Sequence, residues 1–405
     1  MLRKALLVAG MLSVTAAAQA AEPGKFFSDG KAGFDLRYRF ETVDQDGILE
    51  EAEASTLRMR MTLSSGVVAG FSGVAEVDDV ETVFSDDYNS TRNGKTQYPQ
   101  VADPTGFDLN QLYVQYAGLP KTVVRLGRQR IKLDNERFIG GVAWRQNEQT
   151  FDAFLVENKG LSKTTLTYAY IDEVRRIFGP DDGSPPASLD AAAHVLNARV
   201  AGLPIGNFTA YDYYLDIETQ PQLASNTVGM RLDGARKITP TASFTYALEY
   251  ARQTDVGDNP AQIDAYYSLL EVGAKVGAVG VMAGYEVLSG AAGTYSATLN
   301  PAFQTPLATL HKFQGWADKF LTTPSAGIRD YYLGANASFA GFNAQLAWHD
   351  FSAEAVSRDY GTEWDLSVSR KFAKHYDVLL KYASYSADEL LTDTDKFWVQ
   401  FVATF

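Results

Sequence analysis

The chain has 405 residues, a formal net charge of −13 and no cysteine. The lack of cysteine excludes a disulfide scaffold and thiolate metal sites, and the acidic balance argues against a nucleic-acid-binding surface. With 46% hydrophobic residues, 22 tyrosines and 23 phenylalanines, the chain has enough apolar material for one large β domain.

Residues 1–20 have the features of a secretory signal peptide. The segment starts with basic Arg3 and Lys4, continues with an apolar run, and ends in the small-residue pattern Ala18-Gln19-Ala20. We expect cleavage at its end and a single domain over residues 21–405. No later segment reaches the roughly 20 apolar residues of a membrane-spanning helix, so the sequence predicts export without a helical anchor.

The rest of the chain alternates apolar and polar residues with the period of two that β-strands require. The clearest examples are residues 34–41, 57–63, 244–250 and 364–368. Weaker candidates and a final strand bring the total to about 18, each close to the length of a tilted membrane strand. The sequence therefore predicts an all-β fold, a transmembrane antiparallel β-barrel of about 18 strands.

The connections between these strands alternate between short and long. Short turns at residues 118–121, 277–280 and 340–341 contrast with long segments such as 79–106 and 289–327. Bacterial barrels have short periplasmic turns and long extracellular loops, and an even strand count places both termini in the periplasm. The pattern therefore predicts the outer membrane of a Gram-negative bacterium.

Strand phase predicts which basic side chains face the lumen. Apolar residues alternate with Arg37 and Arg39 in the first strand and with Arg58 and Arg60 in the second. Arg125 follows the same rule on a later strand. Because a cation held against lipid at mid-membrane costs about 2–4 kcal/mol, we expect these five arginines to line the pore.

Acidic residues with an inward phase come mainly from the second half of the chain. The pore-lining acids expected on this basis are Asp212, Asp216, Asp233, Glu249, Glu271 and Glu286, together with Glu218, Glu363 and Asp365. Strands 1 and 2 lie across an 18-strand ring from strands 10 and 11, so a basic wall would face an acidic wall across a transverse field. The alternative is that these charges pair across neighbouring strands and only solvate a wide channel.

The segment 289–327 is too long and too apolar for a plain surface loop. Its aromatic residues recur at helical spacing, and exposed aromatics of this number need a surface to pack on. We expect the loop to fold into the barrel mouth as a constriction, with packing on neighbouring loops as the alternative. The residues expected there are Leu310, His311, Phe313, Trp316, Asp318 and Phe320. His311 and Asp318 are too few ligands to predict a metal site.

The chain ends in a strand pattern over residues 396–405. Phe397, Phe401 and Phe405 share one face, whereas Gln400 lies on the other. A C-terminal phenylalanine on such a strand resembles the signal by which the outer-membrane assembly machinery recognises its clients. We therefore expect that machinery to be a partner of the chain through Phe405.

Two stretches resemble the alginate-export family of outer-membrane barrels. They run from Leu126 to Ala153, including Arg128-Gln129-Arg130, Arg137 and Trp144-Arg145-Gln146-Asn147, and from Thr305 to Asp330, including Gly315-Trp316-Ala317-Asp318. The resemblance implies an 18-strand porin-like channel whose alginate-secreting members use an arginine-rich lumen to pass an anionic polyuronate. On this resemblance, the positions that would take that part are Arg37, Arg39, Arg58, Arg60 and Arg125.

The histidines argue against an enzyme. A lipid-cleaving barrel needs Ser, His and an acid on the lipid face, whereas His349 has an inward phase and the other three histidines lie in a turn, in a loop and at a strand start. A closed structural barrel would have fewer strands, since about 8 strands fill with side chains whereas 16 to 18 leave a channel. A channel is therefore the predicted function.

The predicted solutes are anionic or polar saccharides such as alginate or its oligomers. We expect the lipid bilayer and lipopolysaccharide as surroundings, with no cofactor, no metal and no nucleic acid. The resemblance implies that a dedicated exporter would carry a long plug where this chain has the short turn of residues 373–375. Because of that turn and the acidic half of the lumen, the alternative is a general or sugar-acid uptake porin with no role in alginate secretion.

Overall fold

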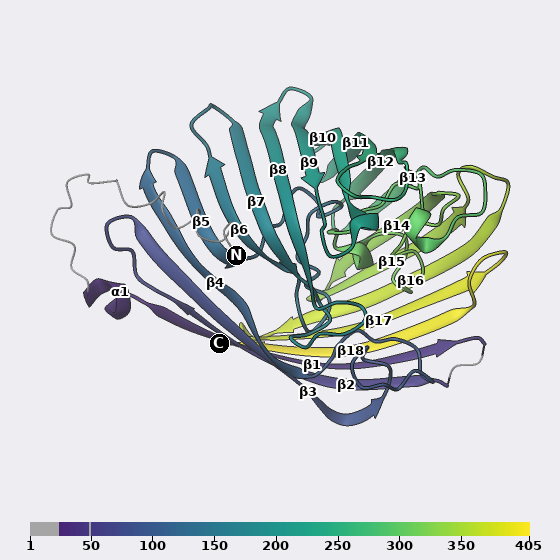
Figure 1. Cartoon of the computed structure of the whole chain (residues 1–405), viewed down its shortest axis with the longest axis horizontal. Coiled ribbons are helices and arrows are strands. Elements are labelled where there is room, and N and C mark those ends of the chain that lie inside the picture. Colours follow the sequence, from purple (N-terminus) through teal and green to yellow (C-terminus); the bar gives the residue numbers. More distant parts are fainter. Residues whose placement is uncertain (1–23, 48–49) are drawn as a thin grey trace.

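The computed structural model describes residues 24–47 and 50–405, so the predicted signal peptide lies outside the described residues. Within them, eighteen strands form one antiparallel sheet in which each strand pairs with its neighbours in sequence. β1 also pairs with β18, from Asp35 opposite Thr404 to Gln45 opposite Thr394, and this pairing closes the barrel (Figure 1). The strands are β1 (Lys31–Gln45), β2 (Ala52–Ser64), β3 (Phe71–Asp87), β4 (Gly106–Leu119), β5 (Thr122–Gln129), β6 (Thr150–Asn158), β7 (Thr164–Arg175), β8 (Ser188–Leu203), β9 (Gly206–Leu215), β10 (Ser225–Lys237), β11 (Ala242–Asp255), β12 (Asp264–Val276), β13 (Val279–Leu288), β14 (Ile328–Phe339), β15 (Phe342–Ser352), β16 (Asp359–Phe372), β17 (Tyr376–Ala387) and β18 (Thr394–Thr404). The predicted antiparallel barrel is confirmed.

Helical structure is limited to short pieces. The described part of the chain holds the α-helix α1 (Gly24–Ser28) and the 3-10 turns η3 (Pro221–Leu223), η4 (Ala297–Leu299) and η5 (Leu310–Lys312). No helix among the described residues is long and apolar enough to cross a membrane.

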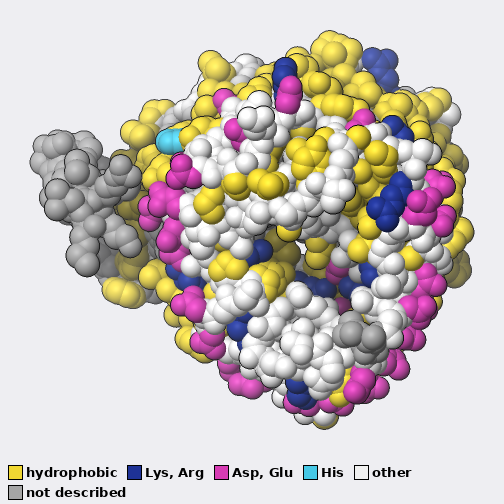
Figure 2. Space-filling model, turned by 45° about the vertical axis from the view of Figure 1, so that its right-hand side comes forward, with side chains coloured by type: hydrophobic (Ala, Val, Ile, Leu, Met, Phe, Trp, Pro, Cys, Tyr) yellow, Lys and Arg dark blue, Asp and Glu magenta, His cyan; other side chains and the backbone are white. Residues whose placement is uncertain are grey.

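The strands place apolar side chains on the outside, as a wall in contact with lipid requires. In β18, Phe397 and Phe401 are 38% and 40% exposed, whereas Trp398 between them is 0% exposed. The register continues this face onto β1, where Tyr38 lies opposite Phe401. Figure 2 shows apolar side chains gathered along the top and the upper sides of the molecule. The phase predicted for the last strand is confirmed.

Short turns close one end of the barrel and long connections the other. Between β14 and β15, for example, only Ala340 and Gly341 intervene, with φ of 50° and 81°. Positive φ at both positions is what a two-residue hairpin turn requires. The longest connection, residues 289–327, joins β13 to β14 at the other end. Short turns are periplasmic in bacterial outer-membrane barrels, so we name the short-turn end the periplasmic end and the long-loop end the extracellular end.

The main buried apolar cluster lies inside the barrel. Its wall members include Tyr211 and Tyr267, and residues from the connections 130–149 and 289–327 complete it. The ring of Phe138 lies 5.2 Å from that of Tyr211 and 5.4 Å from that of Tyr267, measured between centroids. An 18-strand barrel is too wide to fill with wall side chains alone. Loop residues fill it here, so several inward positions of the wall are apolar.

Candidate functional site

Two long connections fold into the lumen, and we name them the first luminal loop (residues 130–149) and the second luminal loop (residues 289–327). Arg145 holds the first loop to the wall, because its guanidinium donates to the Glu41 carboxylate of β1 at 3.0 Å. Arg37 of the same strand donates to three consecutive backbone carbonyls of this loop, at 3.0 to 3.4 Å. Glu41 is 0% exposed, so the first luminal loop lies directly on the inner surface of the wall.

The second luminal loop lies against inward-facing carboxylates of β16. The backbone N–H of Trp316 donates to Asp365 at 3.2 Å, and that of Ala317 donates to Glu363 at 2.6 Å. Gly315 permits this approach, since a Cβ there would lie 2.3 Å from a carboxylate oxygen of Glu363. The loop therefore lies inside the barrel rather than on the neighbouring extracellular loops.

The helical spacing of aromatic residues in the second luminal loop does not reflect a helix. The turn η5 is its only helical piece near these residues in the described chain, and Gln314 and Asp318 have φ of 49° and 62°, which a helix does not allow. The aromatic rings instead meet different parts of the wall. Phe320, for example, packs 4.7 Å from Phe351 between ring centroids.

The two luminal loops also bind each other. The N–H of Gly140 donates to the Leu307 carbonyl at 2.9 Å, and the N–H of Thr309 donates to the Glu136 carbonyl at 3.0 Å. The Thr309 hydroxyl donates to the Glu136 carboxylate at 2.6 Å. Burial opposes ionisation of Glu136, but this hydrogen bond and one from Gly141 lower its pKa. The loops therefore form one interlocked body.

Arg137 joins this body to a third element. It is 0% exposed, and its guanidinium donates to Glu286 of β13 at 2.8 Å and to the Thr305 hydroxyl of the second loop at 2.9 Å. The guanidinium also lies 4.7 Å from the ring centroid of Phe313. Burial opposes the charge, but Glu286 raises the pKa of Arg137 and keeps it ionised.

Lys381 of β17 lies where the wall meets both loops. Its ammonium is 3.8 Å from the ring centroid of Trp316, 4.2 Å from that of Trp144 and 5.3 Å from that of Trp398. It is also 2.6 Å from Nε2 of His311. Indole rings from the two loops and from β18 thus surround one buried cation. Each such contact contributes about 0.5–2 kcal/mol.

His311 links Lys381 to a second charged group, Asp318. Burial lowers the pKa of His311 to about 3, so the ring is neutral near pH 7. A neutral ring accepts from Lys381 at Nε2 and donates from Nδ1 to Asp318, at 2.7 Å. The Asp318 carboxylate also forms ion pairs with Arg145, at 3.0 Å, and with Lys396, at 3.2 Å. His311 and Asp318 are therefore parts of the loop anchor.

The predicted pore arginine Arg60 is engaged by three carboxylates. Its guanidinium lies 2.5 Å from Asp78, 2.6 Å from Glu148 of the first luminal loop and 3.6 Å from Glu76. Burial opposes ionisation of Glu148, but Arg60 and Arg130 lower its pKa well below the usual range. Arg60 thus binds the loop to the wall.

The other predicted arginines divide into two groups. Arg37, Arg39 and Arg58 lie under the first luminal loop, and Arg58 is bound to Asp35 at 2.5 Å. Arg125 does not contact that loop in the described structure, and its guanidinium donates to Gln115 of β4 at 2.8 Å. The structure therefore brings four of the five together beneath one loop and leaves the fifth apart.

The basic wall facing an acidic wall is not found in the predicted form. Local pairs such as Arg58 with Asp35 and Arg231 with Glu249, at 2.5 Å each, neutralise much of the charge within one wall. The alternative of pairing across neighbouring strands describes these contacts better. A carboxylate on the next strand is closer than one across the lumen, so local attraction dominates.

Some of the predicted acids face the lumen and others do not. Asp233, Glu249, Glu271 and Glu286 lie on inward positions and bind inward partners, as Glu271 does the Tyr332 hydroxyl at 2.8 Å.

The inward assignment of Asp212 is wrong. In β9 the rings of Tyr211 and Tyr213 pack on Phe138 inside the barrel, so Asp212 between them faces outward. The luminal loops reverse the usual apolar-out pattern here. Asp216 and Glu218 follow the end of β9 at Leu215, so they belong to the extracellular connection rather than to the wall.

The described structure has cavities around the interlocked loops. One at the extracellular end, which we name the upper vestibule, has a volume of about 640 Å³. Its charged lining residues are Arg145, Arg176, Lys319, Lys396 and Asp318. Figure 2 shows an opening at the long-loop end with Lys and Arg side chains at its depth. Two further cavities, of about 710 and 370 Å³, lie on the periplasmic side of the loops.

Sequence phase did not identify most of the vestibule residues. Arg176 and Lys319 lie in loops, where no period assigns a direction. The inward direction of Lys396 could have been predicted from strand phase, because it shares the inward face of β18 with Trp398 and Gln400.

The family of the chain follows from comparison with known sequences. A family described as alginate export matches residues 30–294, which is more than half of the chain. The chain belongs to the alginate-export family. Together with the closed barrel, this places it among the outer-membrane porins, whose family and fold are those of channels rather than enzymes.

Solved structures of similar fold agree with this placement. OccAB2 of Acinetobacter baumannii has a TM-score of 0.71 at 15% identity, over 94% of this chain and 100% of that one. OccAB4 of the same organism has a TM-score of 0.69 at 15% identity, over 93% and 98%. OpdK of Pseudomonas aeruginosa, solved with vanillate, has a TM-score of 0.69 at 14% identity, over 94% and 99%. At these identities the likeness shows the fold alone. Comparison with curated proteins gives no significant match.

Replacing residues 305–321 of the second luminal loop by a short Gly-Ser linker should raise single-channel conductance in planar bilayers. The segment holds Trp316 and Phe320 inside the barrel, so its loss widens the passage. Heat-modifiable migration would show that the variant folds. Conductance equal to that of the parent, in a folded variant, would rule out a constricting role.

Arg60→Ala should increase conductance and open-channel noise. Removing one partner of a buried ion pair costs about 3–5 kcal/mol, and here it leaves Asp78 without its guanidinium partner and Glu148 of the first luminal loop with Arg130 alone. Arg125→Ala is the matched control, because Arg125 also has inward phase but does not contact that loop in the described structure. If both variants have the same noise as the parent, these ion pairs do not hold the loop in place.

Proposed function

We propose that the chain is an outer-membrane channel for small anionic solutes of the saccharide type, such as uronates and short alginate oligomers. The observation that carries this proposal is the charge of the upper vestibule. Four cationic side chains line it, and among its described lining residues Asp318 is the only carboxylate. A cleft lined mainly by one sign of charge concentrates ions of the opposite sign.

Two of these cations are available to a solute. Lys319 donates to the Thr394 hydroxyl at 2.7 Å, and Arg176 lies 4.5 Å from the ring centroid of Phe178. Neither forms an ion pair within the described residues. Burial, with Lys396 nearby, lowers the pKa of Lys319 to about 8, and burial with Arg92 lowers that of Arg176 to about 10. A bound carboxylate would offset this desolvation.

The apolar lining of the upper vestibule supports a solute that carries a ring. Ile177, Phe178, Leu310 and Leu321 line the same cavity as the four cations. Binding sites of this kind combine apolar surface with a few polar groups that fix orientation. The structure of OpdK was determined with vanillate, which is a carboxylate on a ring. Basic and apolar groups in one vestibule suit a cyclic carboxylate.

The interlocked loops support small solutes over a threaded polymer. The remaining cavities, of about 640, 710 and 370 Å³, fall in the range typical of small-molecule sites, about 300–1,000 Å³. A long polyuronate would need a wider continuous passage. We therefore favour uptake of sugar acids, with no role in alginate secretion, over export of the polymer.

We also propose that Phe405 is the contact for the outer-membrane assembly machinery. Its backbone exchanges hydrogen bonds with Phe34 of β1, at 2.8 and 3.0 Å, where the barrel closes. Its ring is 58% exposed and lies 5.4 Å from that of His375. An exposed terminal ring beside the closing strand pair is accessible to a partner that completes the barrel.

Proteoliposomes containing the chain should admit glucuronate faster than glucose at equal gradients, because the vestibule enriches anions. The advantage should shrink in 1 M salt, where the screening length falls to about 3 Å. Influx of alginate oligomers should decrease with chain length. Equal fluxes of glucuronate and glucose at low salt would refute the anion preference, and undiminished flux of long oligomers would favour polymer passage.

Anion selectivity should fall as the pH rises from 7 to 9, because Lys319, with its pKa lowered to about 8, is charged below that pH and neutral above it. Lys319→Met should start with lower selectivity at pH 7 and lose this pH dependence. Lys312→Met is the matched control on the same loop, since Lys312 lies beside Glu136 at 3.7 Å rather than in the upper vestibule. Reversal potentials in a salt gradient measure the effect. A pH profile unchanged in Lys319→Met would remove this lysine from the selectivity mechanism.

A further inference from the structure

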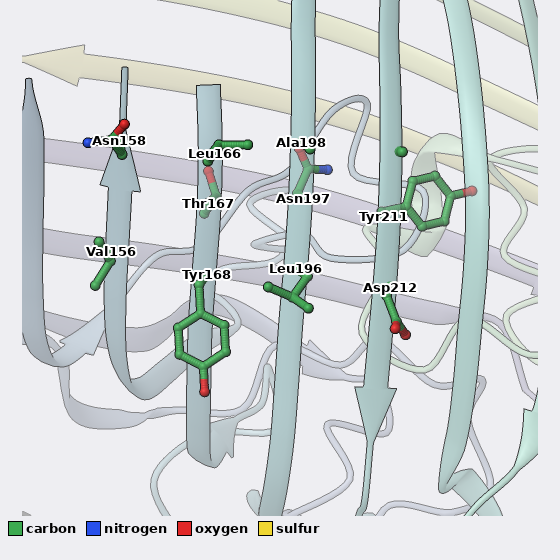
Figure 3. Close-up of a pocket in the computed structure, with 11 residues that line it drawn as sticks. Val156, Asn158, Leu166, Thr167, Tyr168, Leu196, Asn197, Ala198, Tyr211 and Asp212 are labelled. Carbon is green, nitrogen blue, oxygen red and sulfur yellow. The ribbon is translucent and has the colours of Figure 1, made fainter. Parts of the chain in front are cut away.

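The outer wall carries a shallow groove of about 450 Å³ across β6 to β9 (Figure 3). Its floor consists of two small residues, Ala198 and Ala210, which lie opposite each other on β8 and β9. In the same row, Leu166 stands on one side and Met230 on the other. Small side chains between larger ones leave a furrow along the wall.

The direction of neighbouring side chains places this groove on the lipid side. Asn197, next to Ala198, donates to Asp134 of the first luminal loop at 2.8 Å. Tyr211, next to Ala210, packs on Phe138 of the same loop. Alternate residues of a strand face opposite sides, so the alanines face outward.

One acceptor oxygen of a residue that lines the groove, and one on the wall just above the groove, have no hydrogen-bond donor among the described residues. Oδ1 of Asp212, which lies beside Leu196 one row above the floor, is buried and has no hydrogen-bond partner among the described residues. The same holds for Oδ1 of Asn226, one row further up on β10. Lipid tails offer no hydrogen bond, so the Asp212 carboxylate, which lines the groove, requires a donor from an occupant.

An aromatic row fixes the depth of these acceptors. Nδ1 of His194 and the Tyr168 hydroxyl form a hydrogen bond of 2.9 Å. The centroid of the His194 ring lies 5.2 Å from that of Tyr170 and 6.3 Å from that of Tyr214. Aromatic girdles mark the membrane interfaces of barrels. Asp212 lies one row below this girdle and three residues before the extracellular end of β9 at Leu215. This is the level of the linkage groups of outer-leaflet lipids.

We propose that the groove holds one outer-leaflet lipid whose acyl chain lies over Ala198 and Ala210 and whose interfacial hydroxyl or amide N–H donates to Asp212 and Asn226. Acyl chains that are amide-linked or hydroxylated, as in lipopolysaccharide, carry such donors at this depth, whereas plain ester-linked chains do not. The groove is outside the lumen, so this site is independent of the proposed transport function.

Native mass spectrometry of the delipidated, refolded chain tests the site, with lipid A and dioleoylphosphatidylcholine as probes. The parent should retain one lipid A and should not retain phosphatidylcholine, which has no hydrogen-bond donor. Asp212→Leu should weaken lipid A retention about tenfold, as the loss of one charge-assisted hydrogen bond predicts. Ala210→Leu should weaken it by filling the furrow. Ala283→Leu is the control, because Ala283 faces outward between Val272 and Leu333 on the far strands β12 to β14.

Loss of retention in both groove variants, with Ala283→Leu like the parent, would support the site. Equal retention of the two probes, or lipid A retention unchanged in both groove variants, would overturn it. A protein dimer that depends on Asp212 would also overturn it and would assign the groove to a second copy of the chain. Single-channel conductance of the same variants should match the parent, which separates this test from the transport proposal.

Discussion

The arrangement of the luminal loops depends on the enclosure of one cation, the ammonium of Lys381. Indole rings from both luminal loops and from β18 surround it, and Nε2 of the neutral His311 ring accepts a hydrogen bond from it. A lysine taken out of water is costly unless its charge is compensated. Here the folded loops provide two of the three indole rings and the histidine, so the loops cannot leave the lumen without exposing the cation and separating Trp144 and Trp316 from it.

Two kinds of charge in the lumen have different roles. Buried groups such as Arg60 and Arg137 are matched by carboxylates within 3 Å and hold loop to wall. Vestibule groups such as Lys319 and Arg176 have hydroxyl, carbonyl or ring neighbours instead. Paired charges contribute little field at a distance, whereas uncompensated ones act on a passing ion. The number of inward arginines is therefore a poor guide to selectivity, and the pairing state of each is the better one.

Most of the fold was predictable from the sequence because it follows from a period of two and from turn chemistry. The strand candidates at residues 34–41, 57–63, 244–250 and 364–368 and the final strand all correspond to strands. The assignment of side-chain direction from strand phase fails where the inward residues are apolar. Phase reasoning takes inward residues to be polar, but the luminal loops bring an apolar core inside, so Tyr211 and Tyr213 face inward and Asp212 outward. Contacts between distant loops leave no periodic signal, which is why Lys319 and Arg176 were missed.

The interlocked loops constrain how the lumen can change. The second luminal loop is bound to the first through Thr309, to β13 through Arg137 and Glu286, and to β16 through Ala317. Moving one loop alone would break the contacts that join it to the other, and moving both would separate Glu286 from Arg137 and Glu363 from the N–H of Ala317. Opening is therefore cooperative, and its free energy is the sum of several buried contacts. To pass a thick polymer, the two loops would have to move and break all of these contacts. A small solute needs only the cavities that already lie beside the loops.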